Sequence, residues 1–169
     1  MRKFPFSLFC FLILLQNGCA LVTDSATSFG GTQAINTARG AHAKILIIES
    51  VHSSKGYHQV KFWPFHNGIG PNISSRLLRT INERVAEEIK NIGFEGRGES
   101  PVVVKGEVIH IYEGILINSI VVKVYLLDGA TGRSLGVANV EGREEGLLGI
   151  EPAAEAVASG VVELLEKYK

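Results

Sequence analysis

The side chains that could carry out chemistry in this sequence are few, and their spacing matches no common catalytic arrangement. A zinc site would need clustered histidines, but no two of the five stand at helical metal-ligand spacing: His42, His52, His58, His66 and His110. The middle three could converge in one long connection, so a metal site there stays an alternative, and we interpret His110 as a hydrogen-bonded core residue. On a helix, Glu87 and Glu88 would point about 100° apart and could not share a proton. The sequence therefore predicts no catalytic residue, no metal and no cofactor, and we expect a protein that is not an enzyme.

Sequence motifs and the net charge exclude further classes of function. The sequence contains no Gly-x-Ser-x-Gly turn, no phosphate-binding loop and no His-Glu-x-x-His pair. Gly68-Ile-Gly70 precedes a helical pattern, but Ile73 stands where a dinucleotide-binding turn needs its third glycine, so we interpret the motif as a loop or helix cap. The 17 basic and 17 acidic residues balance, which argues against a nucleic-acid partner because such proteins carry a clustered basic excess.

A short apolar segment at the N-terminus is the clearest functional signal. Arg2 and Lys3 precede 12 mainly apolar residues, Phe4–Leu15, which small and polar residues follow. This three-part pattern is typical of a secretory signal peptide, which we assign to residues 1–18. As a helix the run reaches only about 18 Å, too short to cross the ~30 Å hydrocarbon core of a bilayer.

The residues after this run, Leu14–Ala20 (Leu-Leu-Gln-Asn-Gly-Cys-Ala), resemble the lipobox of bacterial lipoproteins. In that family a cysteine after a small residue is acylated and becomes the mature N-terminus, which implies Cys19 as the lipid-attachment site. With Ala20 after it, the resemblance implies a periplasm-facing anchor in the outer membrane. The other cysteine, Cys10, lies within the signal, so the mature chain would hold no thiol for Cys19 to pair with. Ordinary signal-peptidase cleavage, with Cys19 incidental, stays an alternative.

The remaining sequence divides into a tether and one domain. Residues 19–42 are rich in Ala, Thr, Ser and Gly, so we expect a flexible, lipidated tether there and a single domain at 43–169. The domain begins with a predicted strand, Lys44–Val51. Apolar residues then recur at three- and four-residue steps from Ile73 to Ile92, which predicts an amphipathic helix. Its expected caps are Asn72 or Ser74 at the start and Gly93 at the end.

Three further strands and a second helix complete the expected fold. The strands are Val102–Tyr112, Ser119–Leu127 and Leu135–Arg143, and the turn Asp128–Gly132 favours a hairpin because glycine tolerates a positive φ. Pro152 suits the first turn of a closing helix. The order β-α-β-β-β-α predicts an α+β two-layer sandwich, a mixed four-stranded sheet with two helices on one face. We expect the first helix to connect the first strand to a parallel neighbour.

Alternation along these strands separates two faces of the sheet. Mainly small and β-branched residues form the face expected to contact the helices: Val104, Gly106, Val108, His110, Ile120, Val122, Val124, Leu126, Gly136, Ala138 and Val140. The opposite face is too apolar to meet only water, and contiguous apolar surface usually marks a contact site. It provides the candidate docking residues for a protein partner or a second copy: Ile109, Val121, Tyr125, Leu127 and Val137. The alternative is that the connection Ser53–Pro71 covers this face as a lid, through Phe62, Trp63 and Phe65.

Two stretches, Val104–Gly114 and Val121–Gly136, resemble a widespread group of bacterial lipoproteins of unknown function. In that group a glycine-containing strand and a strand-Asp-x-x-Thr-Gly-strand hairpin precede an alanine-rich C-terminal helix. The layout is also similar to the lipoprotein activators of penicillin-binding proteins and to the amino-terminal domain of the Tol translocation propeller protein. The resemblance implies protein binding, and it supplies no active-site residues.

We therefore expect an outer-membrane-anchored periplasmic lipoprotein that acts as a protein-binding, assembly or regulatory module of an envelope complex. One alternative is a subunit of an export or pore-forming assembly, which self-association into a ring would favour. A less favoured alternative is a small envelope hydrolase, which a bound metal or a pocket enclosing several histidines would favour.

Overall fold

The computed structural model describes residues 35–36, 40–49, 57, 59–92 and 100–166, all within one compact unit. The signal segment 1–18, Cys19 and most of the expected tether lie outside these residues, as does the expected helix cap Gly93. No helix in the described ranges is long and apolar enough to span a bilayer.

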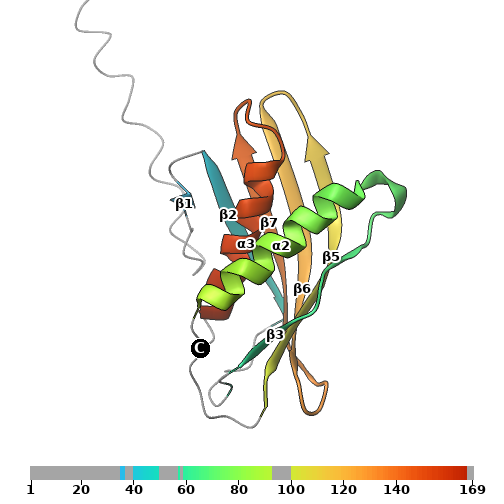
Figure 1. The fold of residues 1–169 in the computed structure, drawn as a ribbon, viewed down its shortest axis with the longest axis vertical. Helices are drawn as coiled ribbons and strands as arrows, with labels where there is room; N and C mark the ends of the chain where they lie inside the picture. The colour runs from blue at the N-terminus through green and yellow to red at the C-terminus, as the bar shows by residue number, and fades with distance from the viewer. Residues whose placement is uncertain (1–34, 37–39, 50–56, 58, 93–99, 167–169) are drawn as a thin grey trace, which may run out of the picture. The chain divides into compact units, whose positions relative to one another are not determined.

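The sheet is built around four long strands, which are the four that alternation and β-branching predict (Figure 1). Three short strands add to them and pair at the edges, so the expectation of a four-stranded sheet is wrong for the described chain. The order across the sheet is β1-β2-β7-β6-β5-β3, with β4 also paired to β5. The bounds are β1 Ile35–Asn36, β2 Ala41–Glu49, β3 Val60–Phe62, β4 His66–Asn67, β5 Val102–Glu113, β6 Ile117–Asp128 and β7 Ser134–Glu145. β3 lies within Gln59–Trp63, which the sequence marks as a possible strand. β1 and β4 were missed because two residues are too few to display a period.

Strand directions make the sheet mixed, as predicted. β2, β7, β6 and β5 pair antiparallel in that order, whereas β3 and β4 run parallel to β5. The predicted parallel neighbour of the first strand is wrong, since β2 pairs antiparallel with β7. The helix instead connects β3 and β4 to β5, a crossover that could not be assigned without recognising those short strands.

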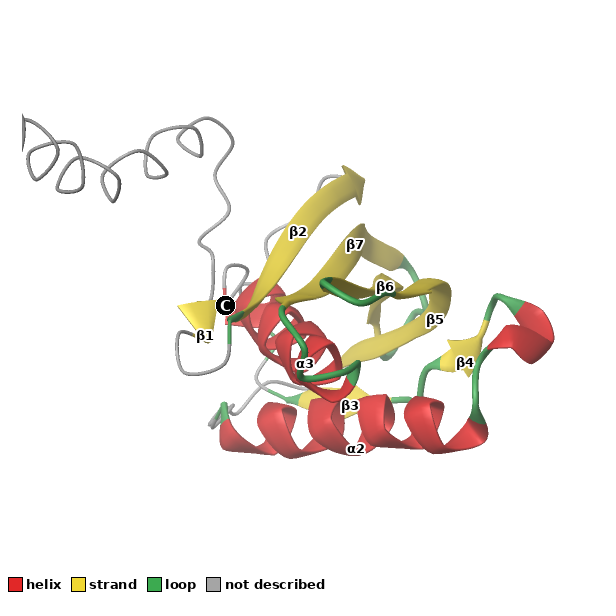
Figure 2. Cartoon of the chain, turned by 90° about the horizontal axis from the view of Figure 1, so that it is seen from above, coloured by secondary structure: helices red, strands yellow, loops and turns green. Residues whose placement is uncertain are grey.

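Both helices lie on one side of the sheet (Figure 2). Helix α2 spans Ser75–Asn91, and a short 3-10 turn, η1 (Gly70–Asn72), precedes it. Ser74 caps its N-terminus, because its Oγ accepts a hydrogen bond from the Leu77 N–H at 3.1 Å. Its buried stripe follows the predicted spacing: Leu77, Ile81, Val85 and Ile89. Helix α3, Glu151–Glu166, has Pro152 in its first turn and packs on β2, β6, β7 and α2. Both predicted helices are therefore present.

Glycines let α3 lie close to the sheet. A Cβ on Gly160 would lie 2.6 Å from Val140 Cγ1, and a Cβ on Gly142 would lie 2.0 Å from the Ala153 carbonyl oxygen. Carbon atoms in good contact stay about 3.5–4.0 Å apart, so neither position has room for a side chain. The predicted inner face of the sheet forms the core beneath the helices, and Val104, Val108, Val122, Val124 and Val140 are wholly buried.

Candidate functional site

The sheet surface that faces away from α2 and α3 is the candidate site, and we name it the open face. The strand registers place its side chains in rows across the sheet. One row runs Lys105, Tyr125 and Val137, and the next runs Glu107, Lys123, Asn139 and Leu46. Most of these side chains keep partial exposure, whereas those of the opposite face are buried.

The five docking residues predicted from the sequence do not form one continuous patch. Tyr125 pairs directly with Val137, and Leu127 lies in the adjoining row. Val121 and Ile109 lie beyond the row that contains Lys123. Val137 is only 5% exposed, so it supports its neighbours from below and offers a partner little surface. Tyr125 is therefore the centre of the predicted set.

Tyr125 is held by charged neighbours on two strands. The ammonium groups of Lys105 and Lys123 lie 5.8 and 5.3 Å from its ring centroid, which is cation–π distance. Its hydroxyl donates a hydrogen bond to Glu107 Oε1 at 2.9 Å, and Glu107 Oε2 lies 3.4 Å from His66 Nε2. The cluster fixes an aromatic ring between two cations, and a ring fixed in this way loses little entropy on binding.

A β-bulge in β5 changes which residues reach the open face. Val108 pairs with Val122, but His110 pairs with Val121, so Ile109 is the extra residue. Beyond the bulge, His110 is exposed and Ile111 turns inward to pack against the core. The interpretation of His110 as a core histidine is therefore wrong, because a strict period of two cannot register an inserted residue.

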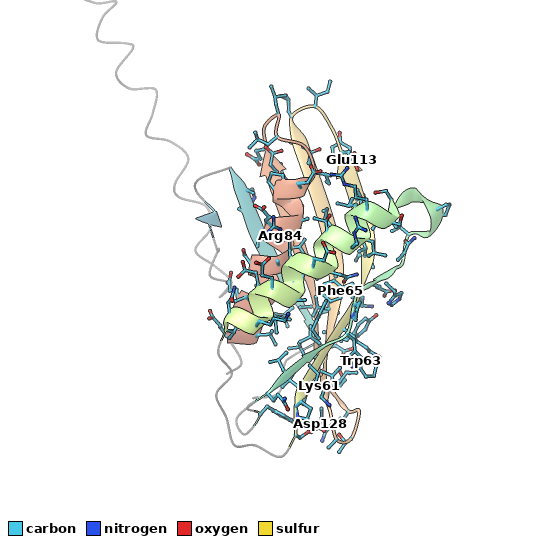
Figure 3. The ribbon with its side chains drawn as sticks, viewed as in Figure 1. Lys61, Trp63, Phe65, Arg84, Glu113 and Asp128 are labelled. Atoms are coloured by element: carbon cyan, nitrogen blue, oxygen red, sulfur yellow. The ribbon has the colours of Figure 1, made fainter. Side chains whose placement is uncertain are left out.

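Two of the three aromatic residues in the connection before α2, Phe62 and Phe65, do not cover the open face, so the lid alternative is wrong for them. Trp63 and His66 of the same connection lie at the edge of that face, and residues 53–56 and 58 lie outside the described ranges. Phe65 is 2% exposed and packs edge-to-face on Phe62, with ring centroids 5.2 Å apart, on the helix side of the sheet. Asn82 of α2 fixes this segment, since its Oδ1 accepts from the Phe65 N–H at 2.7 Å and its amide donates to the Phe65 carbonyl at 3.1 Å. Trp63 remains 56% exposed at the β3 edge (Figure 3).

Sequence reasoning missed two apolar parts of this surface. Trp63 was assigned to the lid, whereas its N–H donates to the Val104 carbonyl at 2.8 Å, which extends β3 along β5. In β2, Leu46, Ile47 and Ile48 are 60%, 37% and 49% exposed, and the described pairing of β1 reaches only the first two residues of β2. A strand at the edge of a sheet with one face in water normally alternates apolar and polar residues. The unbroken apolar run within Lys44–Val51 departs from this alternation, and that departure was the signal in the sequence for an exposed apolar edge.

A separate open groove of about 600 Å³ lies along α2, on the other side of the molecule from the open face. It is lined by Phe62, Pro64, Ser75, Leu78, Arg79, Asn82, Glu83 and Ala86. Leu78 and Ala86 form a partly buried stripe beside the core stripe of α2.

The described histidines do not form a metal site. Within the described ranges no three metal-ligating side chains come together, and His52 and His58 lie outside those ranges.

At the β6–β7 turn, the Tyr57 hydroxyl donates to Asp128 Oδ2 at 2.5 Å. That hydrogen bond, with the backbone N–H groups of Thr131 and Ala130, lowers the pKa of Asp128 to about 2. The turn closes with Gly132 at a φ of +71°, as the sequence predicts.

Comparisons with known proteins give a fold and no family. No protein-family model matches the sequence, and neither does any curated protein. A dodecamer of a PelC variant from Paraburkholderia phytofirmans is similar at a TM-score of 0.50 and 14% identity, over 73% of this chain and 96% of that one. A second PelC dodecamer from the same organism has a TM-score of 0.48 and 12% identity, over 73% and 96%. A protein from Caulobacter crescentus CB15, described provisionally as a lipoprotein, has a TM-score of 0.42 and 13% identity, over 68% and 96%. The first match shows a shared α+β fold.

Proposed function

We propose that this chain is a lipid-anchored envelope protein, held at Cys19 in the outer membrane and facing the periplasm, that docks a partner protein through the open face. The N-terminal sequence pattern supports the anchor. The observation that carries the docking role is the fixed Tyr125 cluster, with exposed Trp63 at one edge of the same face and Leu46 at the other. The role is one of binding, without catalysis.

The residue types of the open face suit a protein partner. Tyrosine and tryptophan dominate the energetics of protein interfaces, and charged side chains around them set the register of docking. The face contains cations and anions in adjacent rows, including Lys105, Lys123, Glu107 and Glu141. Such an alternating surface favours a folded protein over a uniformly charged polymer.

The dimensions of the face suit a stable interface. Strands β5, β6 and β7 are each 12 residues long, and β2 adds nine. Four strands of this length project an area of about 40 by 20 Å, or about 800 Å². One partner contributes about 800 Å² to an interface of standard size.

Site-specific photo-crosslinking in intact envelopes tests the docking role. A photoreactive phenylalanine analogue replaces Trp63 in one strain and Glu83, a 69% exposed side chain on α2, in the control strain. We expect a discrete adduct from position 63 and none from position 83. Equal adducts from both positions, or none from position 63, would contradict docking through this face.

The anchor needs a test of its own. We expect the native protein to stay with membranes through a high-salt wash and its Cys19→Ser variant to leave them. Retention of the variant would show that acylation is not what holds the protein there.

A second candidate is self-assembly, as a subunit of a ring within an export or pore-forming assembly. The exposed apolar part of β2 favours it, because an edge strand can pair with another chain, and the described pairing of β1 reaches only the first two residues of β2. In addition, the PelC variant whose structure is similar at a TM-score of 0.50 is a dodecamer. An adduct of twice the chain's mass in the crosslinking experiment would favour this candidate over a different partner.

A further inference from the structure

Two loops at one end of the sheet expose four large aliphatic side chains. The β5–β6 loop contains Ile115 and Leu116, 82% and 68% exposed, and the β7–α3 loop contains Leu147 and Leu148, 78% and 59% exposed. Both loops lie at the upper end in Figure 1, and we name these four residues the apolar tip. Single exposed leucines are ordinary, but four on adjoining loops form a patch that calls for a contact.

The apolar tip has a rigid base. The Gly146 N–H donates to the Leu116 carbonyl at 3.0 Å, which joins the two loops through their backbones. Below them, the Asn118 side-chain amide donates to Glu144 Oε2 at 3.0 Å, and these two residues are only 4% and 0% exposed. The four side chains of the tip therefore project into solvent from two loops that are fixed to each other and to the sheet.

The N-terminal segment joins the domain at the same end. Ala41 pairs with Glu144, and Asn36 pairs with Ala41, so the first described residues lie beside the end of β7. Cys19 and Ile35 are 16 residues apart, and such a segment spans at most about 55 Å. A bilayer that holds Cys19 is thus within reach of the tip.

Charge indicates which surface the tip can meet. Neither loop contains Lys or Arg, and the flanking residues Glu113, Glu145 and Glu151 are acidic. Attraction to anionic lipid therefore cannot drive the contact. Aliphatic side chains at the end of a hairpin can enter the boundary between head groups and acyl chains, about 5–10 Å deep, while the hydrogen-bonded backbone stays outside.

We infer that the apolar tip inserts into the lipid bilayer as a second membrane contact, beside the lipid on Cys19. This inference rests on the proposed anchor, which brings the tip to the membrane. Two contacts at one end direct the long strands away from the membrane and present the open face sideways to the periplasm.

The test uses the full acylated chain in phosphatidylcholine vesicles, with an environment-sensitive fluorophore on a single introduced cysteine. The variants are Leu148→Cys, Ile115→Cys and the control Ala130→Cys, an exposed position in the β6–β7 turn at the opposite end. We expect blue-shifted emission and several-fold stronger quenching by doxyl-labelled lipid at positions 148 and 115 than at position 130. The difference should persist between low and high salt, because no charge attraction contributes.

The possible outcomes test the insertion of the tip and the acylation of Cys19 separately. Vesicle-bound protein whose fluorophores at 148 and 115 respond like the one at 130 would overturn insertion. A blue shift at positions 148 and 115 in native envelope membranes but not in pure lipid vesicles would also overturn insertion, since a protein would then cover the tip. The intact mass reports acylation at Cys19 independently, so an unmodified cysteine with a quenched tip would refute the anchor and leave insertion standing.

Discussion

The two hydrogen bonds between Asn82 and Phe65 decide where the aromatic connection lies, and Asn82→Leu removes both while keeping the side-chain volume similar. Each bond contributes about 0.5–1.5 kcal/mol, so the variant should lose about 1–3 kcal/mol of unfolding free energy. With a urea m-value of about 2 kcal/mol/M, the unfolding midpoint should fall by about 0.5–1.5 M. Trp63, the single tryptophan of the chain, is the natural fluorescence probe of this segment.

Hydrogen exchange gives the residue-level readout of the same change. The amide of Phe65 loses its acceptor and should exchange at least tenfold faster, while amides in the centre of β6 change only with global stability. Asn91→Leu, at the exposed end of the same helix, is the matched control and should leave the midpoint unchanged. An unchanged midpoint in Asn82→Leu with unaltered exchange at Phe65 would refute the role given to this residue.

Three further predictions concern stability and pH. Gly160→Ala should lower stability by about 1–3 kcal/mol through overlap with Val140, and a double-mutant cycle with Val140→Ala should recover part of the loss; strict additivity would contradict close packing. Gly132→Ala should cost about 1 kcal/mol in thermal unfolding because φ is +71° there, and a neutral effect would count against a strained turn. The stability that Asp128 contributes is complete above its unfolded pKa near 3.8 and is lost as the pH falls toward its folded pKa of about 2. Tyr57→Phe should therefore raise the pKa of Asp128 in a carboxyl NMR titration, and an unchanged midpoint would refute the hydrogen bond's effect.

The parts of the fold that the sequence predicts are those with a repeated local signal. The α2 stripe recurs over about three turns, and the strands β5, β6 and β7 alternate long enough to sort their buried and exposed residues. The Asp128–Gly132 turn is predicted because side-chain and glycine chemistry act within a few residues. The sequence marks Gln59–Trp63, which contains β3, as a possible strand. The parallel pairing of β3 and β4 with β5 and the hydrogen bonds of Asn82 to the segment between them are long-range contacts, which no local pattern in the sequence encodes.

The candidate site shows the same division. Tyr125 could be placed on the outer face by counting, but its lysine and glutamate neighbours come from pairing with β5, which counting does not give. The bulge at Ile109 reversed the side assigned to His110. The apolar tip lies in loops, where no period exists, although the pairs Ile115-Leu116 and Leu147-Leu148 beside glycines were visible in the sequence.

The central claim, that the open face docks a protein, is tested most directly by the size of the native complex after extraction in mild detergent. Trp63→Ala combined with Leu46→Arg changes two side chains that are more than half exposed, so thermal unfolding should stay within about 0.5 kcal/mol of wild type. Arg79→Ala, a 71% exposed side chain on α2, is the control. We expect the wild type and the control to migrate as one larger species and the double variant as a monomer, since loss of interface anchors weakens binding by at least about 30-fold. A correctly folded double variant that keeps the full complex would contradict docking through the open face.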